Sequence, residues 1–237
     1  MITANITLPN ILIIGPSGTG KSTSLRKLNP TTTGVLNKEQ KQLPFPQAKD
    51  FIHNKMCATQ GDVTTELLMG LGMNPAIDNI ILESFTSIDE SILSYCRKTY
   101  TGWDIFFHHN RMVRELIETT KTLSFPRPKI GPKFVVVIGH DEIINIPQPN
   151  GSSKAVRRLK VDGKELSGTL EKEFTIVLFT EVIEEVIAGV PYMRYKFLTN
   201  YDGVCSAKTP MGMFKEKYID NDLNMVINRI KEYYEIK

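Results

Sequence analysis

The chain has 237 residues, of which 41% are hydrophobic and 23% are charged, and its formal net charge is +3. This length suffices for one substantial hydrophobic core, so we expect residues 1–237 to form a single domain. The sequence pI near 8.6 is mildly basic, which excludes a protein that coats nucleic acid or membranes through its overall charge. Any nucleic-acid site must therefore be a local patch.

The cysteines and the amino-terminal segment favour a reducing compartment without export. The three cysteines show no paired spacing (Cys57, Cys96 and Cys205), which is typical of a cytoplasmic protein. Adjacent His108 and His109 would point about a quarter-turn apart on a helix, so they do not predict a zinc site. The first apolar run ends at Gly15, is too short to cross a bilayer and lacks the basic start of a signal peptide. We therefore expect a cytoplasmic protein with no membrane partner.

Short apolar runs alternate with segments of helical periodicity up to residue 138, the pattern of a parallel sheet with connecting helices. Continuous apolar runs predict buried strands at 11–14, 80–82 and 134–138, and residues 33–37 are predicted to form another short strand. Periodicity predicts helices over 22–28, 62–71 and 103–123, and one that opens with a capping box of Ser87 and Glu90. On the helix over 103–123, the expected buried face holds Phe106, Val113, Leu116, Ile117 and Thr120.

The pattern changes after residue 144. The run NIPQPNGSS over 145–153 has a loop composition throughout, and it leads into four basic residues, so we predict a mobile basic loop. Beyond it, a turn at 162–163 precedes predicted antiparallel strands at 174–179 and 193–198 and a final helix over 223–234. The predicted fold class is α/β, with a mostly parallel central sheet, helices on both faces and an antiparallel carboxyl-terminal extension. The four basic residues are Lys154, Arg157, Arg158 and Lys160.

Residues 15–22 read GPSGTGKS and match the phosphate-binding pattern GxxxxGK[ST] directly behind the first predicted strand. The glycines let backbone N–H groups curl inward at a helix amino terminus, which makes a nest for phosphate. Lys21 adds a positive charge for the β- and γ-phosphates, and the Ser22 hydroxyl can ligate Mg²⁺. The sequence therefore predicts ATP and Mg²⁺ as cofactors. The expected contact residues are Gly15, Pro16, Ser17, Gly18, Thr19, Gly20, Lys21, Ser22 and Thr23.

A P-loop enzyme also needs an acidic residue at the end of a neighbouring strand to hold Mg²⁺, and Glu83 follows the apolar run 80–82. Aspartate is more usual there, and the extra methylene of glutamate would shift the metal shell and slow hydrolysis. Asp141 and Glu142 are the alternative, because they follow the strand 134–138 much as an acidic pair does in AAA+ enzymes. They lie two residues beyond the usual strand end, so Glu83 ranks first.

The chain resembles the RecA-core ATPases of phages, including phage single-strand annealing ATPases, in the order of its sequence blocks. These blocks are GPSGTGKS, a strand that leads into LNKEQKQLPF, ILESFTS, FVVVIGH, a polar loop and AKTPMGMF. The resemblance spans residues 11–234. It implies a RecA-like P-loop fold, a role in recombination or replication, and a location in the host cytoplasm. It also implies Glu39 as the base that orients and deprotonates water. His140, which follows the strand 134–138, is a candidate sensor of the γ-phosphate.

The same resemblance implies two partners. It places a single-stranded DNA site in the loop after the sensor strand, and thus at Lys154, Arg157, Arg158 and Lys160. It also places ATP at the interface of a homo-oligomer, where Lys208 would reach a neighbouring subunit's γ-phosphate as an arginine finger does.

Two other functions fit the P-loop. A nucleotide or polynucleotide kinase would close an arginine lid over the phosphates, for which Arg157 and Arg158 are candidates. A non-enzymatic, nucleotide-gated interaction module is favoured if the glutamate at position 83 stops Mg²⁺ chemistry and leaves nucleotide binding intact.

Overall fold

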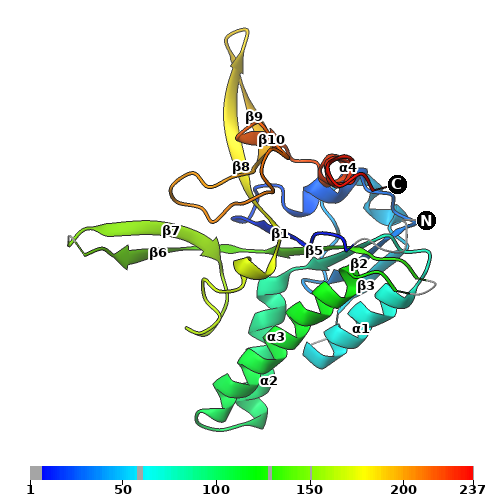
Figure 1. Ribbon diagram of the computed structural model, residues 1–237, viewed down its shortest axis with the longest axis vertical. Helices are drawn as coiled ribbons and strands as arrows, with labels where there is room; N and C mark the ends of the chain where they lie inside the picture. Colours follow the sequence, from blue (N-terminus) through cyan, green and yellow to red (C-terminus); the bar gives the residue numbers. More distant parts are fainter. Residues whose placement is uncertain (1–6, 58–60, 128–129, 150, 237) are drawn as a thin grey trace.

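The structure is a computed structural model that describes residues 7–57, 61–127, 130–149 and 151–236. An eight-stranded sheet with the order β10-β9-β8-β1-β5-β4-β2-β3 forms its centre (Figure 1). The neighbours from β8 to β3 pair in parallel, whereas β9 pairs antiparallel with β8 and β10 antiparallel with β9. The strands are β1 (Ile11–Ile14), β2 (Thr33–Asn37), β3 (His53–Met56), β4 (Asn79–Glu83), β5 (Phe134–Gly139), β8 (Ile176–Ile187), β9 (Val190–Leu198) and β10 (Tyr218–Asp220).

Helices cover both faces of this sheet (Figure 1). One face is covered by α1 (Gly61–Met73), α2 (Phe85–Thr99) and α3 (Asp104–Ser124). The other is covered by α4 (Leu223–Tyr233) together with the 3-10 helices η1 (Ser22–Lys27) and η2 (Pro46–Asp50), and a third, η3 (Glu171–Glu173), precedes β8. The predicted α/β class with a mostly parallel sheet and an antiparallel extension is confirmed. In the described part of the chain, every helix is too short or too polar to cross a membrane.

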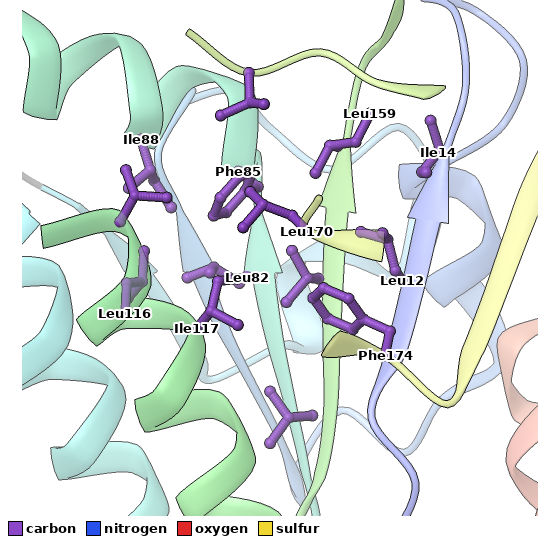
Figure 2. Packing of buried hydrophobic residues seen from close by; sticks show 14 of the residues in the cluster. Leu12, Ile14, Leu82, Phe85, Ile88, Leu116, Ile117, Leu159, Leu170 and Phe174 are labelled. Carbon is purple, nitrogen blue, oxygen red and sulfur yellow. The ribbon is translucent and has the colours of Figure 1, made fainter. Parts of the chain in front are cut away.

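The central strands are apolar along their whole length because side chains on both faces enter a core. Alternate residues of β1 show this division, since successive side chains of a strand point to opposite faces. Leu12 and Ile14 pack with Phe85 and Leu116 beneath α2 and α3 (Figure 2). Ile11 and Ile13 pack in the second core, which the apolar face of α4 closes.

Several local predictions need correction. The segment after the P-loop is a 3-10 helix rather than an α-helix. The amino-terminal cap of α2 is Ser84, so Ser87 and Glu90 lie inside the helix and form no capping box. Phe106 is 43% exposed although its helix is as predicted. Strand β3 was not predicted, because its sequence HNKM has no apolar run.

The predicted mobile loop is a β-hairpin. β6 (Asp141–Pro147) pairs antiparallel with β7 (Ser153–Leu159) in a separate two-stranded sheet that projects from the body of the protein (Figure 1). The prediction was wrong because loop composition was assigned to 145–153 as a whole, whereas only its middle forms the turn. Pairing between the two flanking segments, including Glu142 opposite Arg158, gives the hairpin its register.

Candidate functional site

The P-loop follows β1 directly and depends on its glycines. Gly18 and Gly20 have positive φ values of 80° and 90°, a conformation that side chains with a Cβ atom rarely adopt. At Gly15, a Cβ atom would lie 1.9 Å from the Thr180 hydroxyl oxygen, so Thr180 within β8 leaves no room for a side chain. Thr19 and Thr180 share a hydrogen bond of 2.5 Å between their hydroxyl oxygens. The hydrogen bond therefore holds the loop against β8, a strand that the sequence did not place beside it.

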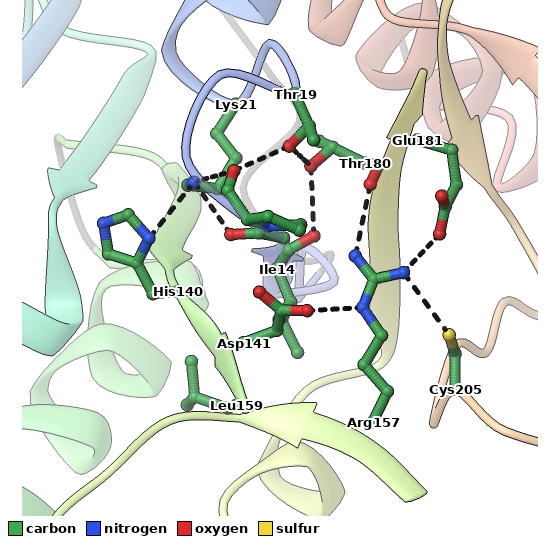
Figure 3. A network of polar contacts seen from close by, with 12 residues as sticks. Ile14, Thr19, Lys21, His140, Asp141, Arg157, Leu159, Thr180, Glu181 and Cys205 are labelled. Carbon is green, nitrogen blue, oxygen red and sulfur yellow. Dashed lines mark hydrogen bonds and ion pairs between the residues drawn. The ribbon is translucent and has the colours of Figure 1, made fainter. Parts of the chain in front are cut away.

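Lys21 is buried inside this loop. Its Nζ atom donates hydrogen bonds to the carbonyl oxygens of Gly15 at 2.8 Å and Pro16 at 2.7 Å, and it lies 3.5 Å from His140 Nδ1 (Figure 3). Burial lowers the pKa of this ammonium group, and the nearby carboxylate of Glu83 opposes that shift. A cation held in a ring of backbone groups suits a phosphate ligand.

Ser22 and Glu83 meet as the sequence predicts for a Mg²⁺ site. The Ser22 hydroxyl donates a 2.5 Å hydrogen bond to Glu83 Oε1, while the buried Oε2 atom has no hydrogen-bond partner among the described residues. A buried oxygen without a partner is costly. These oxygens fit Mg²⁺, which prefers oxygen ligands and keeps several of its waters. Ser22 begins η1, directly after the loop that follows β1, and Glu83 is the last residue of β4. In the sheet, β5 separates β1 from β4.

The protonation of Glu83 is coupled to this site. Burial raises its pKa to about 7, the hydrogen bond from Ser22 opposes the rise, and the charge of Glu39 adds to it. Because the raised pKa favours the protonated form, a substantial fraction of the carboxyl groups is neutral at pH 7. A bound cation favours the carboxylate, so cation binding must displace the proton.

We therefore expect Mg²⁺–ATP binding to release up to about half a proton per site at pH 7, more at pH 6 and almost none at pH 9. Calorimetric titrations in buffers with different ionisation enthalpies measure this number. Glu83→Gln is the control, because it removes the group that titrates and leaves the protonation of ATP itself unchanged. Equal proton release by the variant and the unaltered protein would contradict the assignment of Glu83.

Glu39 and His140 complete the cluster at the carboxyl ends of β2 and β5. Glu39 Oε1 lies 3.5 Å from His140 Nε2, and Glu39 Oε2 accepts a 2.9 Å hydrogen bond from Lys41. Burial by itself raises the pKa of Glu39, but the contacts with Lys41 and His140 outweigh it and lower the pKa below its ordinary value. Glu39 is therefore ionised at neutral pH. His140 stands between Glu39 and Lys21.

The alternative acidic pair is occupied by arginines. Asp141 and Glu142 lie at the start of β6, where Asp141 pairs with Arg157 and Glu142 accepts a 2.8 Å hydrogen bond from Arg158. Glu142 also accepts a hydrogen bond from Ser167. Neither carboxylate contacts Ser22 in the described contacts, so the geometry favours Glu83 over this pair as the acidic partner of the P-loop.

Arg157 links the hairpin to the P-loop. It pairs with Asp141 on β6 and with Glu181 on β8, and it donates to the carbonyl oxygen of Thr180 at 3.4 Å (Figure 3). Thr180 in turn bonds Thr19 in the P-loop. The Arg157 side chain is only 12% exposed. Its charge is therefore neutralised by carboxylates within the protein and does not face solvent.

Replacing Arg157 with alanine is expected to lower the free energy of unfolding by about 3 kcal/mol, because it leaves Asp141 and Glu181 as partly buried, uncompensated charges. Urea unfolding followed by circular dichroism measures the change. Lys154→Ala is a suitable control, because Lys154 is exposed on the same strand. A loss no greater than that of the control would show that the network does not stabilise the fold.

The other predicted partner-binding residues lie apart from the P-loop. Lys154 donates a 2.7 Å hydrogen bond to the Tyr201 hydroxyl, and Lys160 pairs with Glu90 at 3.3 Å. Lys208 forms a short backbone bridge with Val177, and burial lowers the pKa of its ammonium group. It makes no contact with the P-loop of its own chain in the described contacts. The trans-acting role and the DNA role of these residues stay predictions.

Two residues at the site were missed by the sequence analysis. Thr180 closes over Gly15, and Asn221 lies against Gly20, where a Cβ atom would be 3.3 Å from the Asn221 side-chain oxygen. Asn221 is buried, and neither polar atom of its side chain has a partner among the described residues. Only the pairing of β8 with β1, and the return of the chain before α4, bring them to the loop, so no local pattern could reveal them.

Strand order and site together show an α/β fold with a mostly parallel sheet and a phosphate-binding loop directly behind β1, as the sequence predicted. The P-loop follows β1, the acidic residue follows β4, and β5 with His140 lies between them. Among the described residues, no three or more His, Cys, Asp or Glu side chains form a group that could hold a metal ion by themselves.

Neither a protein-family model nor a curated protein sequence matches this chain. Similar solved structures include a KaiC-like protein from Pyrococcus horikoshii OT3, at 13% identity and a TM-score of 0.43 over 80% of this chain and 77% of that chain. Another is the flagellar accessory protein FlaH from Methanocaldococcus jannaschii, at 14% identity and a TM-score of 0.41 over 90% of this chain and 85% of that chain. At this level the likeness assigns no activity or partner. It lends no support to the narrower resemblance to phage ATPases.

Proposed function

We propose that the protein binds ATP with Mg²⁺ and hydrolyses it. The observation that carries this proposal is the convergence of Lys21, the hydrogen-bonded pair of Ser22 and Glu83, and the 3.5 Å contact of Glu39 with His140 at the carboxyl ends of the parallel strands. These residues come from four segments that are distant in sequence. A glycine loop with a purely structural role would need only the P-loop segment and not the other three.

Each side chain has a defined task in this proposal. The P-loop N–H groups and Lys21 hold the phosphates, while Ser22 and Glu83 hold the metal, which when bound neutralises charge on the β- and γ-phosphates. Glu39, ionised at neutral pH, orients a water molecule and accepts its proton. In this proposal, His140 donates a hydrogen bond to the γ-phosphate and thus distinguishes ATP from ADP.

The site is connected to the β6–β7 hairpin by contacts that a nucleotide could alter. His140 immediately precedes β6, its carbonyl oxygen accepts a 2.8 Å hydrogen bond from the Lys160 backbone just after β7, and Arg157 reaches the P-loop through Thr180. We therefore propose that nucleotide state changes the position of the hairpin. The proposed partner is single-stranded nucleic acid, in the recombination or replication role that the resemblance to phage ATPases implies.

The structure gives less support to the kinase alternative. Arg157 and Arg158 hold carboxylates on the hairpin and beside it, so an arginine lid would first have to break these ion pairs. The interaction-module alternative is favoured only by the raised pKa of Glu83, which weakens Mg²⁺ binding at neutral pH.

The test of the proposed function is phosphate release from ATP by the unaltered protein, with and without Mg²⁺ and with and without an oligonucleotide. We expect Mg²⁺-dependent release of free phosphate that the oligonucleotide stimulates. A phosphorylated nucleotide product in place of free phosphate would establish a kinase. Tight ATP binding without turnover would establish the interaction module.

A further inference from the structure

The tip of the α2–α3 pair carries a surface that the nucleotide site does not use. Trp103 is 86% exposed and Phe107 is 65% exposed, and the Trp103 ring lies 6.3 Å from that of Phe106. A groove of about 920 Å³ opens beside them, between α3 and the turn around Gly163. We call this surface the aromatic groove, and the residues that define it are Trp103, Phe106, Phe107, Arg111, Arg114 and Lys164.

Buried contacts hold the two sides of the aromatic groove in place. His109 on α3 pairs with Asp89 on α2 at 2.7 Å, and the second oxygen of Asp89 accepts a 2.6 Å hydrogen bond from the Asp162 backbone. His108 stacks on Tyr100 with ring centroids 3.8 Å apart. The groove is therefore preformed, so a ligand need not order it.

The charges in the aromatic groove are unbalanced. Arg114 and Lys164 have no ion-pair partner in the described part of the chain, and Arg111 has only a long contact of 3.7 Å with Glu115. Glu165 is the acidic residue of the lining, and it accepts a 2.8 Å hydrogen bond from the Asn110 side chain. Three cations thus surround an aromatic platform, which suits a ligand that carries regularly spaced negative charge.

The lining also distinguishes between nucleic acid and a peptide. Its apolar members are all aromatic, and no aliphatic side chain contributes to it among the described residues. An amphipathic peptide anchors leucine or methionine side chains in a hydrophobic groove, whereas aromatic rings and guanidinium planes stack on bases whatever their sequence. The wide exposure of the Trp103 ring face fits a platform better than an anchor pocket.

We propose that the aromatic groove binds single-stranded nucleic acid, with bases stacked on Trp103 and Phe107 and phosphates held by Arg111, Arg114 and Lys164. This inference rests on the proposed function for its choice of a single-stranded partner, and it moves the binding site from the hairpin to α3. The hairpin arginines are committed to internal ion pairs, whereas the cations of the groove are exposed.

The chain contains a single tryptophan, and it lies in the aromatic groove. Titration with oligothymidylate at low salt should therefore quench the intrinsic fluorescence of Trp103 to saturation. Phe107→Leu should weaken binding by about fivefold to a hundredfold, the range for one lost stacked base. Arg111→Ala with Arg114→Ala should reduce the salt slope of log affinity by about 1.4, because each single-strand phosphate contributes about 0.7.

Matched controls leave the groove intact. Phe125→Leu changes an aromatic residue that is 51% exposed at the other end of α3, and Lys49→Ala with Lys55→Ala removes two exposed charges elsewhere. Both should bind like the unaltered protein. An acidic, phenylalanine-rich peptide is the competing ligand, and heparin is the probe for charge alone.

The outcomes separate the groove from the rest of the proposal. Quenching by the peptide and not by oligothymidylate would make the groove a protein interface. Loss of oligonucleotide binding when the exposed Lys154 and Lys160 are replaced together, and not in the groove variants, would return the site to the hairpin. Tight heparin binding without base-dependent quenching would exclude stacking. ATP affinity, measured on the same samples, reports the nucleotide site independently. Oligonucleotide binding that is unchanged in the Phe107 and Arg111/Arg114 variants would overturn the groove alone. Normal ATP binding without any oligonucleotide binding at low salt would overturn both the groove and the single-stranded partner, and would leave the nucleotide site in place.

Discussion

Replacing Lys21 with alanine is expected to weaken ATP binding by about a hundredfold. A hydrogen bond to a charged group contributes about 1.5–3 kcal/mol, and each 1.4 kcal/mol changes affinity tenfold. Lys21 is the cation enclosed by the loop, where it can contact more than one phosphate oxygen. Titration of a fluorescent ATP analogue, with displacement by ATP, measures the effect.

Two controls make the Lys21 result specific. Lys49→Ala removes an exposed lysine away from the loop and should leave affinity unchanged. Thermal unfolding must show that Lys21→Ala is folded, because the substitution also leaves the carbonyl oxygens of Gly15 and Pro16 without their donor. If the variant is folded and binds ATP normally, the phosphate site lies elsewhere.

The parts of the site that are local in sequence could be predicted. GPSGTGKS defines the nest, the cation and the hydroxyl within eight residues, and an apolar run that ends in Glu83 identifies a strand end at the same edge of a parallel sheet. The contact between Ser22 and Glu83 follows from these two features. The contact between Glu39 and His140 depends on which strands are neighbours, and the sequence gives no order for them.

The hairpin shows where a reading of composition fails. Pro149 and Gly151 lie between the two strands, as loop composition indicated, but the flanking residues are in register across seven pairs. Arg157 read as a free cation because its partners, Asp141 and Glu181, are contributed by β6 and β8. A run of charged residues reveals its ion-pair partners only when they are close in sequence, and those of Arg157 are not. The exposed aromatic residues of α3 were not predicted, because Phe106 has the spacing of the buried helix face although its side chain is exposed.

Replacing Glu39 with glutamine is expected to lower the turnover number for ATP by at least about a hundredfold, the lower end of general-base contributions. Glutamine keeps the size of the side chain and can still contact His140, but it cannot accept a proton from water. ATP affinity should stay unchanged, because Glu39 makes no contact with the P-loop in the described contacts. Single-turnover measurements of phosphate release separate the chemical step from binding.

Glu142→Gln is the matched control for this substitution, because it makes the same chemical change in the alternative acidic pair. Glu142 is bonded to Arg158 and Ser167, so its replacement should affect the stability of the hairpin and leave turnover nearly intact. The reverse result, with turnover lost in Glu142→Gln and kept in Glu39→Gln, would assign catalysis to the residues that follow β5. In that case the ion pair of Arg158 with Glu142 would have to open when ATP binds, and the hairpin would become part of the active site.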